Sequence, residues 1–168
     1  MQTSAPRIIG PQDGKSGSLG SIGVRFMLDA ADTHEGGFSI LEHPMPPHAL
    51  AAPLHKHSRE DEYSYVLEGR MGALLGDDEV YAEAGDLVVK PRGQWHTFWN
   101  AGDEPCRILE IIAPGGFEGY FAELVELFEQ PGPPDLDKLA EIAGRYGLEM
   151  KPESVPELCE RFGLTAGG

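Results

Sequence analysis

The chain has 168 residues, enough for one domain with a sizeable buried core. Its 28 acidic residues against 13 Lys and Arg give a formal net charge of −15, which argues against nucleic acid or an anionic membrane surface as a partner. The sequence has no apolar run of membrane-spanning length and no apolar signal core, and its two cysteines show no metal-ligand spacing, so we expect a cytoplasmic protein with free thiols.

The N-terminal part of the chain is expected to hold a loose arm followed by two strands. Residues 1–20 are rich in Gly, Ser and Pro, which is typical of a flexible arm. Residues 22–28 have the composition of a first strand, and residues 38–43 that of a second. We expect the prolines that begin at Pro44 to end this second strand.

The middle of the chain is a series of short segments rich in β-branched and aromatic residues. Turn residues separate them, among them a Gly-Asp-Asp sequence that predicts a hairpin. We expect strands over residues 54–57, 62–67, 71–75, 79–84, 87–90, 94–99 and 106–113. So many short strands favour a mainly β fold, a double-sheet jelly-roll barrel (a double-stranded β-helix) over residues 21–114.

A helical pattern replaces the strand pattern after this barrel. Five apolar side chains between Phe117 and Phe128 fall on one face of a predicted helix over residues 117–130. Asp135 is a candidate N-cap for a second helix over residues 136–146, closed by the glycine that follows.

A third, short helix is predicted to end near Gly163. Ser154 and Glu157 have the spacing of a capping box at its start. Residues 115–168 should therefore form a C-terminal helical extension. We expect these helices to pack on the outside of the sheets, with a lid over the barrel mouth or a dimer contact as the alternative role.

Three histidines and one glutamate are candidate ligands of a single divalent metal ion: His55, His57, Glu62 and His96. His55 and His57 are two residues apart on a predicted strand, so their side chains share a face. Glu62 opens the next strand, and a Pro-Arg-Gly turn redirects the chain just before His96. Imidazole and carboxylate together suit Fe, Mn, Ni, Cu or Zn.

Each of these residues also has an ordinary explanation when it is taken alone. Histidine pairs are common on protein surfaces, a histidine beside tryptophans is usually a packed ring, and a glutamate among charges is usually solvated. The conjunction of all four beside glycine and proline favours a metal site. The remaining histidines, His34, His43 and His48, are expected at the surface or behind the ligands.

Two blocks of this sequence resemble the paired signatures of the cupin superfamily. The first block contains His55, His57, Glu62 and Gly69, and the second contains Gly85, Pro91, Gly93, His96 and Asn100. The resemblance implies a jelly-roll barrel that holds one metal ion through the three histidines and the glutamate. The flanking sequences Glu-Asp-Glu-Tyr and Pro-Gly-Gly-Phe-Glu are similar to those of the small quercetin dioxygenase-like cupins.

This resemblance implies an oxidoreductase, a quercetinase-like dioxygenase acting on a small enol-containing or aromatic substrate. Glu62 is a candidate general base. Ser64 and Phe98 share the inward faces of the ligand strands and are candidate pocket residues, although Phe98 fits an ordinary core position equally well. A metal-dependent isomerase, lyase or decarboxylase is the alternative, as is a non-enzymatic cupin that binds a small molecule. We expect a homodimer.

Overall fold

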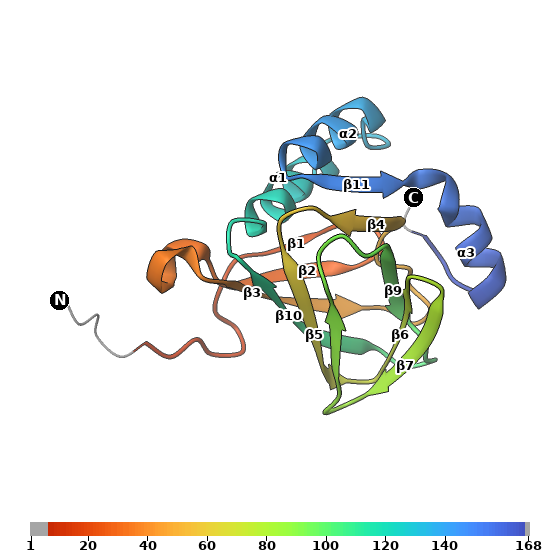
Figure 1. Cartoon of the computed structure of the whole chain (residues 1–168), viewed down its shortest axis with the longest axis horizontal. Helices are drawn as coiled ribbons and strands as arrows, with labels where there is room; N and C mark the ends of the chain where they lie inside the picture. Colours follow the sequence, from red (N-terminus) through yellow and green to blue (C-terminus); the bar gives the residue numbers. More distant parts are fainter. Residues whose placement is uncertain (1–6, 167–168) are drawn as a thin grey trace.

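Two antiparallel sheets face each other in the computed structural model, which describes residues 7–166 (Figure 1). One sheet has six strands in the order β1 (Ser16–Ser18), β2 (Gly23–Leu28), β3 (Ser39–Met45), β10 (Cys106–Ala113), β5 (Asp61–Glu68) and β8 (Leu87–Lys90). The other has five, in the order β11 (Leu148–Lys151), β4 (Leu54–His57), β9 (His96–Asn100), β6 (Arg70–Leu75) and β7 (Asp78–Glu83). The predicted mainly β double-sheet fold is confirmed.

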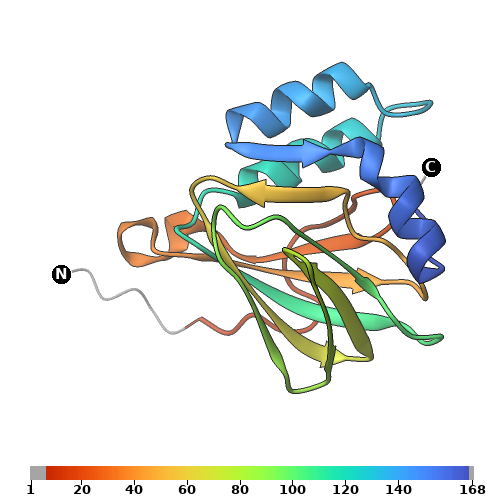
Figure 2. The ribbon, with the colours of Figure 1, turned by 45° about the vertical axis from the view of Figure 1, so that its right-hand side comes forward.

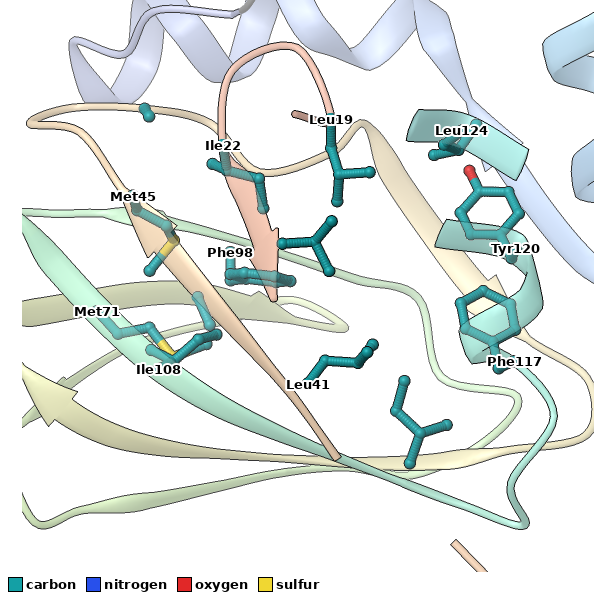
Figure 3. Close-up of a cluster of buried hydrophobic side chains, with 14 of the residues drawn as sticks. Leu19, Ile22, Leu41, Met45, Met71, Phe98, Ile108, Phe117, Tyr120 and Leu124 are labelled. Carbon is teal, nitrogen blue, oxygen red and sulfur yellow. The ribbon is translucent and has the colours of Figure 1, made fainter. Parts of the chain in front are cut away.

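The strands form where side chains alternate between the inside and the outside of the barrel. In β10, Ile108, Glu110 and Ile112 are all at most 1% exposed, whereas the residues between them face outward and are less buried. The inward residues of both sheets pack into one core, part of which Figure 3 shows around Leu41 and Met71. Glu110 is unusual because it is a carboxylate within this apolar interior.

Within its described residues, the C-terminal extension contributes three α-helices, one strand and a short 3-10 helix, Pro152–Ser154. The α-helices are α1 (Glu118–Phe128), α2 (Leu136–Arg145) and α3 (Val155–Phe162). Helices α1 and α2 lie beside β11, which pairs antiparallel with β4 at the edge of the five-stranded sheet (Figure 2). Helix α3 packs elsewhere, with Phe162 stacked 4.3 Å from the ring of Trp99. None of the helices described is both long enough and apolar enough to cross a membrane.

Several local expectations hold. The predicted strands from residue 54 to residue 113 are found within two residues of their expected bounds. The side chain of Asp135 accepts hydrogen bonds from the backbone N–H groups of Asp137 and Lys138, which confirms the predicted cap of α2. Gly147 and Gly163, with φ of 69° and 66°, follow the ends of α2 and α3 in the left-handed conformation that glycine adopts readily.

Other expectations are corrected. The arm predicted over residues 1–20 is not loose at its C-terminal end, because Ser16–Ser18 pair with β2 and Leu19 is buried; residues 1–6 lie outside the described part. Strand β3 continues through Pro44, whose ring is exposed. The capping box at Ser154 does not form, because its hydroxyl donates to the carbonyl of Lys151 and accepts from the N–H of Leu54.

Candidate metal centre and its cavity

The four candidate ligand side chains meet in the barrel interior. Strand β4 carries His55 and His57, β5 carries Glu62, and β9 carries His96, which lies directly across from His55 in the β4–β9 pair. One ligand atom from each residue lies within 4.8 Å of the others, and all four side chains are buried. Residues 41 positions apart in the sequence therefore converge on one point, as the spacing of the two blocks predicts.

The turn before β9 helps to aim His96 at this point. Gly93 has φ of 77°, a conformation that favours glycine, and its N–H donates to the backbone carbonyl of His57 at 2.7 Å. This hydrogen bond holds the start of β9 against β4. The bend expected from the Pro-Arg-Gly sequence therefore links two of the ligand-bearing segments.

Backbone carbonyls fix the orientation of two imidazoles. The Nδ1 atoms of His55 and His96 lie 2.8 and 3.0 Å from the carbonyl oxygens of Pro53 and Gln94. A carbonyl oxygen can only accept, so each Nδ1 donates to its carbonyl. The Nε2 of His55 is then left for a ligand, and the Nε2 of His96 lies 3.1 Å from Glu62 Oε2. A hydrogen bond of this kind to the other ring nitrogen is typical of histidines that bind a metal.

His57 provides a test of whether the site fits a metal. Both of its ring nitrogens are buried and neither makes a hydrogen bond within residues 7–166. Its Nε2 lies 3.4 Å from Glu62 Oε1, and its Nδ1 lies 3.6 Å from a carboxylate oxygen of Glu60. A buried polar group without a partner is costly, and a bound cation would satisfy this one. The donor set of three imidazoles and a carboxylate fits a divalent transition metal.

The protonation states of the site also suit a cation. Burial, followed by the neighbouring His96 and His57, holds the pKa of His55 well below its usual value, so the ring is neutral. Burial alone would raise the pKa of Glu62, but His57 and Lys90 outweigh it and hold this pKa well below its usual range. Neutral imidazole and ionised carboxylate are the forms that bind metal ions.

A buried polar network lies behind Glu62. The ammonium of Lys90, on β8, lies 3.2 Å from Glu62 Oε2 and 2.9 Å from Glu110 Oε1. Ser64 donates a hydrogen bond of 2.8 Å to the other oxygen of Glu110. One cation thus serves two carboxylates, and burial raises the pKa of Glu110 to about 7 despite Lys90. This network was not predicted from the sequence. Lys90 and Glu110 nevertheless point to the same inward face of their strands as buried apolar residues two positions away.

An apolar cavity of about 120 Å³ opens beside the candidate ligands. His55, His57 and Glu62 form part of its wall. Aromatic side chains form much of the rest: Phe98, Phe117, Tyr120, Phe121 and Phe128. The ring of Phe117 lies only 4.4 Å from the ring of His57, and Figure 3 shows it in line with Tyr120 and Leu124 beside the barrel core.

The C-terminal extension is therefore more than an outer layer. Side chains at and after the start of α1 close the cavity, which favours for this helix the alternative role of a lid over the barrel mouth. Phe98 lies in the cavity wall, whereas Ser64 does not line the cavity and acts on it only through Glu110.

The three other histidines fall in different places. His34 is exposed, and the partly exposed His48 pairs with the carboxylate of Asp103 at 2.9 Å. His43 was expected at the surface or behind the ligands, but it is 1% exposed and lines the cavity itself.

Comparison with known proteins places these observations in a family. The Cupin domain family matches residues 42–112, which include all four candidate ligands. The chain is 33% identical over 97 residues to the oxidoreductase iacF of Pestalotiopsis fici, covering 48% of each protein. It is 33% identical over 60 residues to the tetracenomycin polyketide synthase protein TcmJ of Streptomyces glaucescens, covering 36% of this chain and 40% of TcmJ. The chain thus spans less than half the length of these two relatives.

A solved structure supports the same assignment. The polyketide cyclase RemF of Streptomyces resistomycificus superposes with a TM-score of 0.55 at 27% sequence identity, over 66% of this chain and 80% of RemF. The chain belongs to the cupin superfamily, as its two sequence blocks indicated.

Proposed function

We propose that this protein is a metal-dependent enzyme acting on a small, largely apolar substrate that carries an enol or a phenol. The observation that carries this proposal is the position of His55, His57 and Glu62 in the wall of an aromatic-lined cavity. Ligand sites are usually apolar cavities with a few convergent polar groups. The volume of about 120 Å³ is close to the roughly 150 Å³ of an engineered cavity that holds benzene, so it favours a single ring.

The chain provides four candidate ligands, His55, His57, Glu62 and His96, for a divalent Fe, Mn, Ni, Cu or Zn ion. Such an ion, when bound, would polarise the substrate oxygens and make their protons more acidic. Glu62, which the Lys90 ammonium helps to keep ionised, is the candidate base for a substrate hydroxyl. The surrounding aromatic rings exclude water, which strengthens each of these electrostatic interactions.

Oxidation is the reaction class that we place first, as a quercetinase-like dioxygenase reaction. The likeness to iacF, named an oxidoreductase, supports it. A non-oxidative reaction of the same deprotonated substrate, such as an isomerisation, lyase reaction or ring closure, is the second candidate. The likeness to RemF, named a polyketide cyclase, supports this second class.

Oxygen consumption separates the two classes. Metal-loaded protein would be incubated with catechols, pyrogallols and single-ring cyclic 1,3-diketones under air and under argon, with an oxygen electrode and chromatography as readouts. Turnover that stops under argon and consumes O₂ supports the first class, and turnover that continues under argon refutes it. Binding without turnover of any compound would favour a non-enzymatic cupin instead. His57→Ala, which removes a candidate ligand, is the control for metal dependence.

A further inference from the structure

His43 is a buried histidine that takes no part in the candidate metal centre. It lies on β3, whose inward face also carries Leu41 and Met45. In the six-stranded sheet, β10 separates β3 from the ligand-bearing β5. His43 nevertheless lines the same cavity as His55 and His57. A ligand lying in the cavity would therefore reach the candidate metal centre and His43 from different strands.

The hydrogen bonding of His43 leaves one ring nitrogen available. Its Nδ1 lies 2.9 Å from the carbonyl oxygen of Gly23, so this nitrogen carries the proton and donates. Within residues 7–166, no hydrogen bond engages Nε2, which keeps an accepting lone pair. Burial lowers the pKa of His43 to about 4, so the ring is neutral near pH 7 and Nε2 stays an acceptor.

Aromatic neighbours hold this ring in place. Phe121 of α1 meets it edge-on with ring centroids 5.2 Å apart, and the tilted ring of Phe98 lies 6.5 Å away. The acceptor is therefore fixed in direction before any ligand arrives, which lowers the entropy cost of binding. One of these contacts comes from the barrel and the other from the C-terminal extension.

Two other polar side chains of the cavity wall, outside the ligand set, lie close to polar groups. Glu110 accepts from Ser64 and pairs with Lys90. The hydroxyl of Tyr120 lies 3.7 Å from the sulfur of Met150. His43 presents the cavity with a neutral nitrogen acceptor that a ligand hydroxyl can use.

We propose that His43 orients the substrate by accepting a hydrogen bond from a substrate hydroxyl through Nε2. This inference rests on the proposed function and narrows its substrate class. The substrate would be a single ring with a pair of oxygens for the metal centre and a further hydroxyl for His43. His43 is then the residue that distinguishes a trihydroxylated ring from a dihydroxylated one.

Ligand binding without turnover tests this role. Zinc-loaded protein, chosen because zinc has no redox chemistry, would be titrated under argon with catechol, pyrogallol and 1,2,4-benzenetriol in a calorimeter. We expect at least one triol to bind about fivefold more tightly than catechol, the effect of one additional hydrogen bond. Equal affinities for catechol and both triols would overturn the assignment, with no variant needed.

Variants sharpen the test. His43→Phe keeps an aromatic ring beside Phe121 but removes the acceptor, so it should lose the triol preference while its affinity for catechol changes less than twofold. His43→Gln retains an acceptor and should keep part of the preference. His34→Phe, on the surface, is the matched control and should behave as wild type. A His43→Phe protein that weakens all three ligands equally would show a merely structural role and refute the proposal.

Failure of the proposed function gives a different result. Binding of catechol that is lost in His57→Ala, but with no triol preference in wild type, refutes the role of His43 and leaves the metal-dependent function standing. Binding of catechol that is unaffected by His57→Ala refutes the metal-centred function. Absence of binding by all three phenols in zinc-loaded wild type would refute both.

Discussion

The cavity wall is built from two regions of the chain, one inside the part that matches the cupin family and one outside it. The barrel strands that carry His55, His57, Glu62 and His96 lie within residues 42–112, the part that matches the cupin family. The opposite wall, which includes Phe117 and the α1 side chains, lies wholly outside that match. The candidate ligands therefore belong to the part of the barrel that matches the family, whereas much of the aromatic wall of the cavity belongs to the C-terminal extension.

This difference explains why the family assignment leaves the substrate open. Relatives that share the ligand-bearing strands need not share a wall built by residues 117–150. Function resides in the site as a whole rather than in the fold. The two regions can be perturbed separately, because a change in the wall should spare metal binding and a change in the ligands should spare the barrel core.

Removal of a ligand should have the largest effect. His57→Ala or His96→Ala is expected to abolish or severely weaken metal retention, because loss of a residue that merely supports a ligand already costs about 10–100-fold in affinity. Elemental analysis of the purified variants measures this. His34→Ala and His48→Ala are the controls and should retain the wild-type metal content. Undiminished metal in both ligand variants would show that the centre lies elsewhere.

Removal of the Lys90 ammonium, which lies behind Glu62, should cause the largest change in stability. Lys90→Met leaves the buried carboxylates of Glu62 and Glu110 without their cation, which should lower the free energy of unfolding by about 3–5 kcal/mol. Urea unfolding at pH 7 measures it. Lys56→Met, which loses a partly exposed pair with Glu149 and a contact with the Trp95 ring, should cost about 1 kcal/mol. Equal losses in the two variants would contradict a special role for the buried network.

The pH dependence of stability should report the burial of His43. The pKa of His43 is about 4 in the folded protein and near 6.5 in an unfolded chain. Between pH 4 and pH 6.5, His43 is therefore protonated in the unfolded chain but neutral in the folded protein. The contribution of neutral His43 to the free energy of unfolding is complete above pH 6.5. It is lost as the pH falls toward 4, which lowers the free energy of unfolding by up to about 3 kcal/mol. In metal-free protein, the unfolding free energy of His43→Phe should therefore fall less steeply over this interval. Parallel curves for the two proteins would show that His43 is not buried as a neutral ring.

Local sequence patterns predicted the barrel and the convergence of the four candidate ligands. Strand periodicity, turn glycines and the spacing of His55, His57, Glu62 and His96 are short-range signals, and each is fixed by a few neighbouring residues. The strand β11 was missed because its pairing with β4 joins residues about ninety positions apart. When a four-residue strand is stabilised mainly by such distant contacts, its own sequence need not show a strong strand pattern.

The Lys90–Glu110 pair escaped prediction for a related reason. Each residue looks like an isolated charge in an apolar strand, and their contact depends on β8 and β10 flanking β5 in the sheet. Strand order is a property of the whole fold. The position of His43 in the cavity likewise depends on how α1 folds back over the barrel, which a helical pattern alone does not indicate.

Enlarging the wall should separate cavity size from metal binding. Leu124→Ala removes a cavity-lining side chain of α1 and should cost about 2 kcal/mol of stability, the low end for such a truncation because the side chain already borders a cavity. The variant should gain affinity for 2,3-dihydroxynaphthalene relative to catechol at unchanged metal content. Leu158→Ala, in the separate cluster around Trp99, should cost similar stability without changing ring-size preference. An unchanged preference in Leu124→Ala would show that α1 does not set the size limit.

The smallest expected effect comes from the cap of α2. Asp135→Ala removes the acceptor for the N–H groups of Asp137 and Lys138 and should cost about 1 kcal/mol. For a chain of this length, that corresponds to a fall of about 2–4 °C in Tm by calorimetry. Metal content should not change, since the α2 side chain that lines the cavity, Leu139, is not a candidate ligand. Glu129→Ala, an exposed site, should shift Tm by less than Asp135→Ala does. A loss of metal on uncapping α2 would show that the extension supports the centre itself, and the separation of chemistry from shape would then fail.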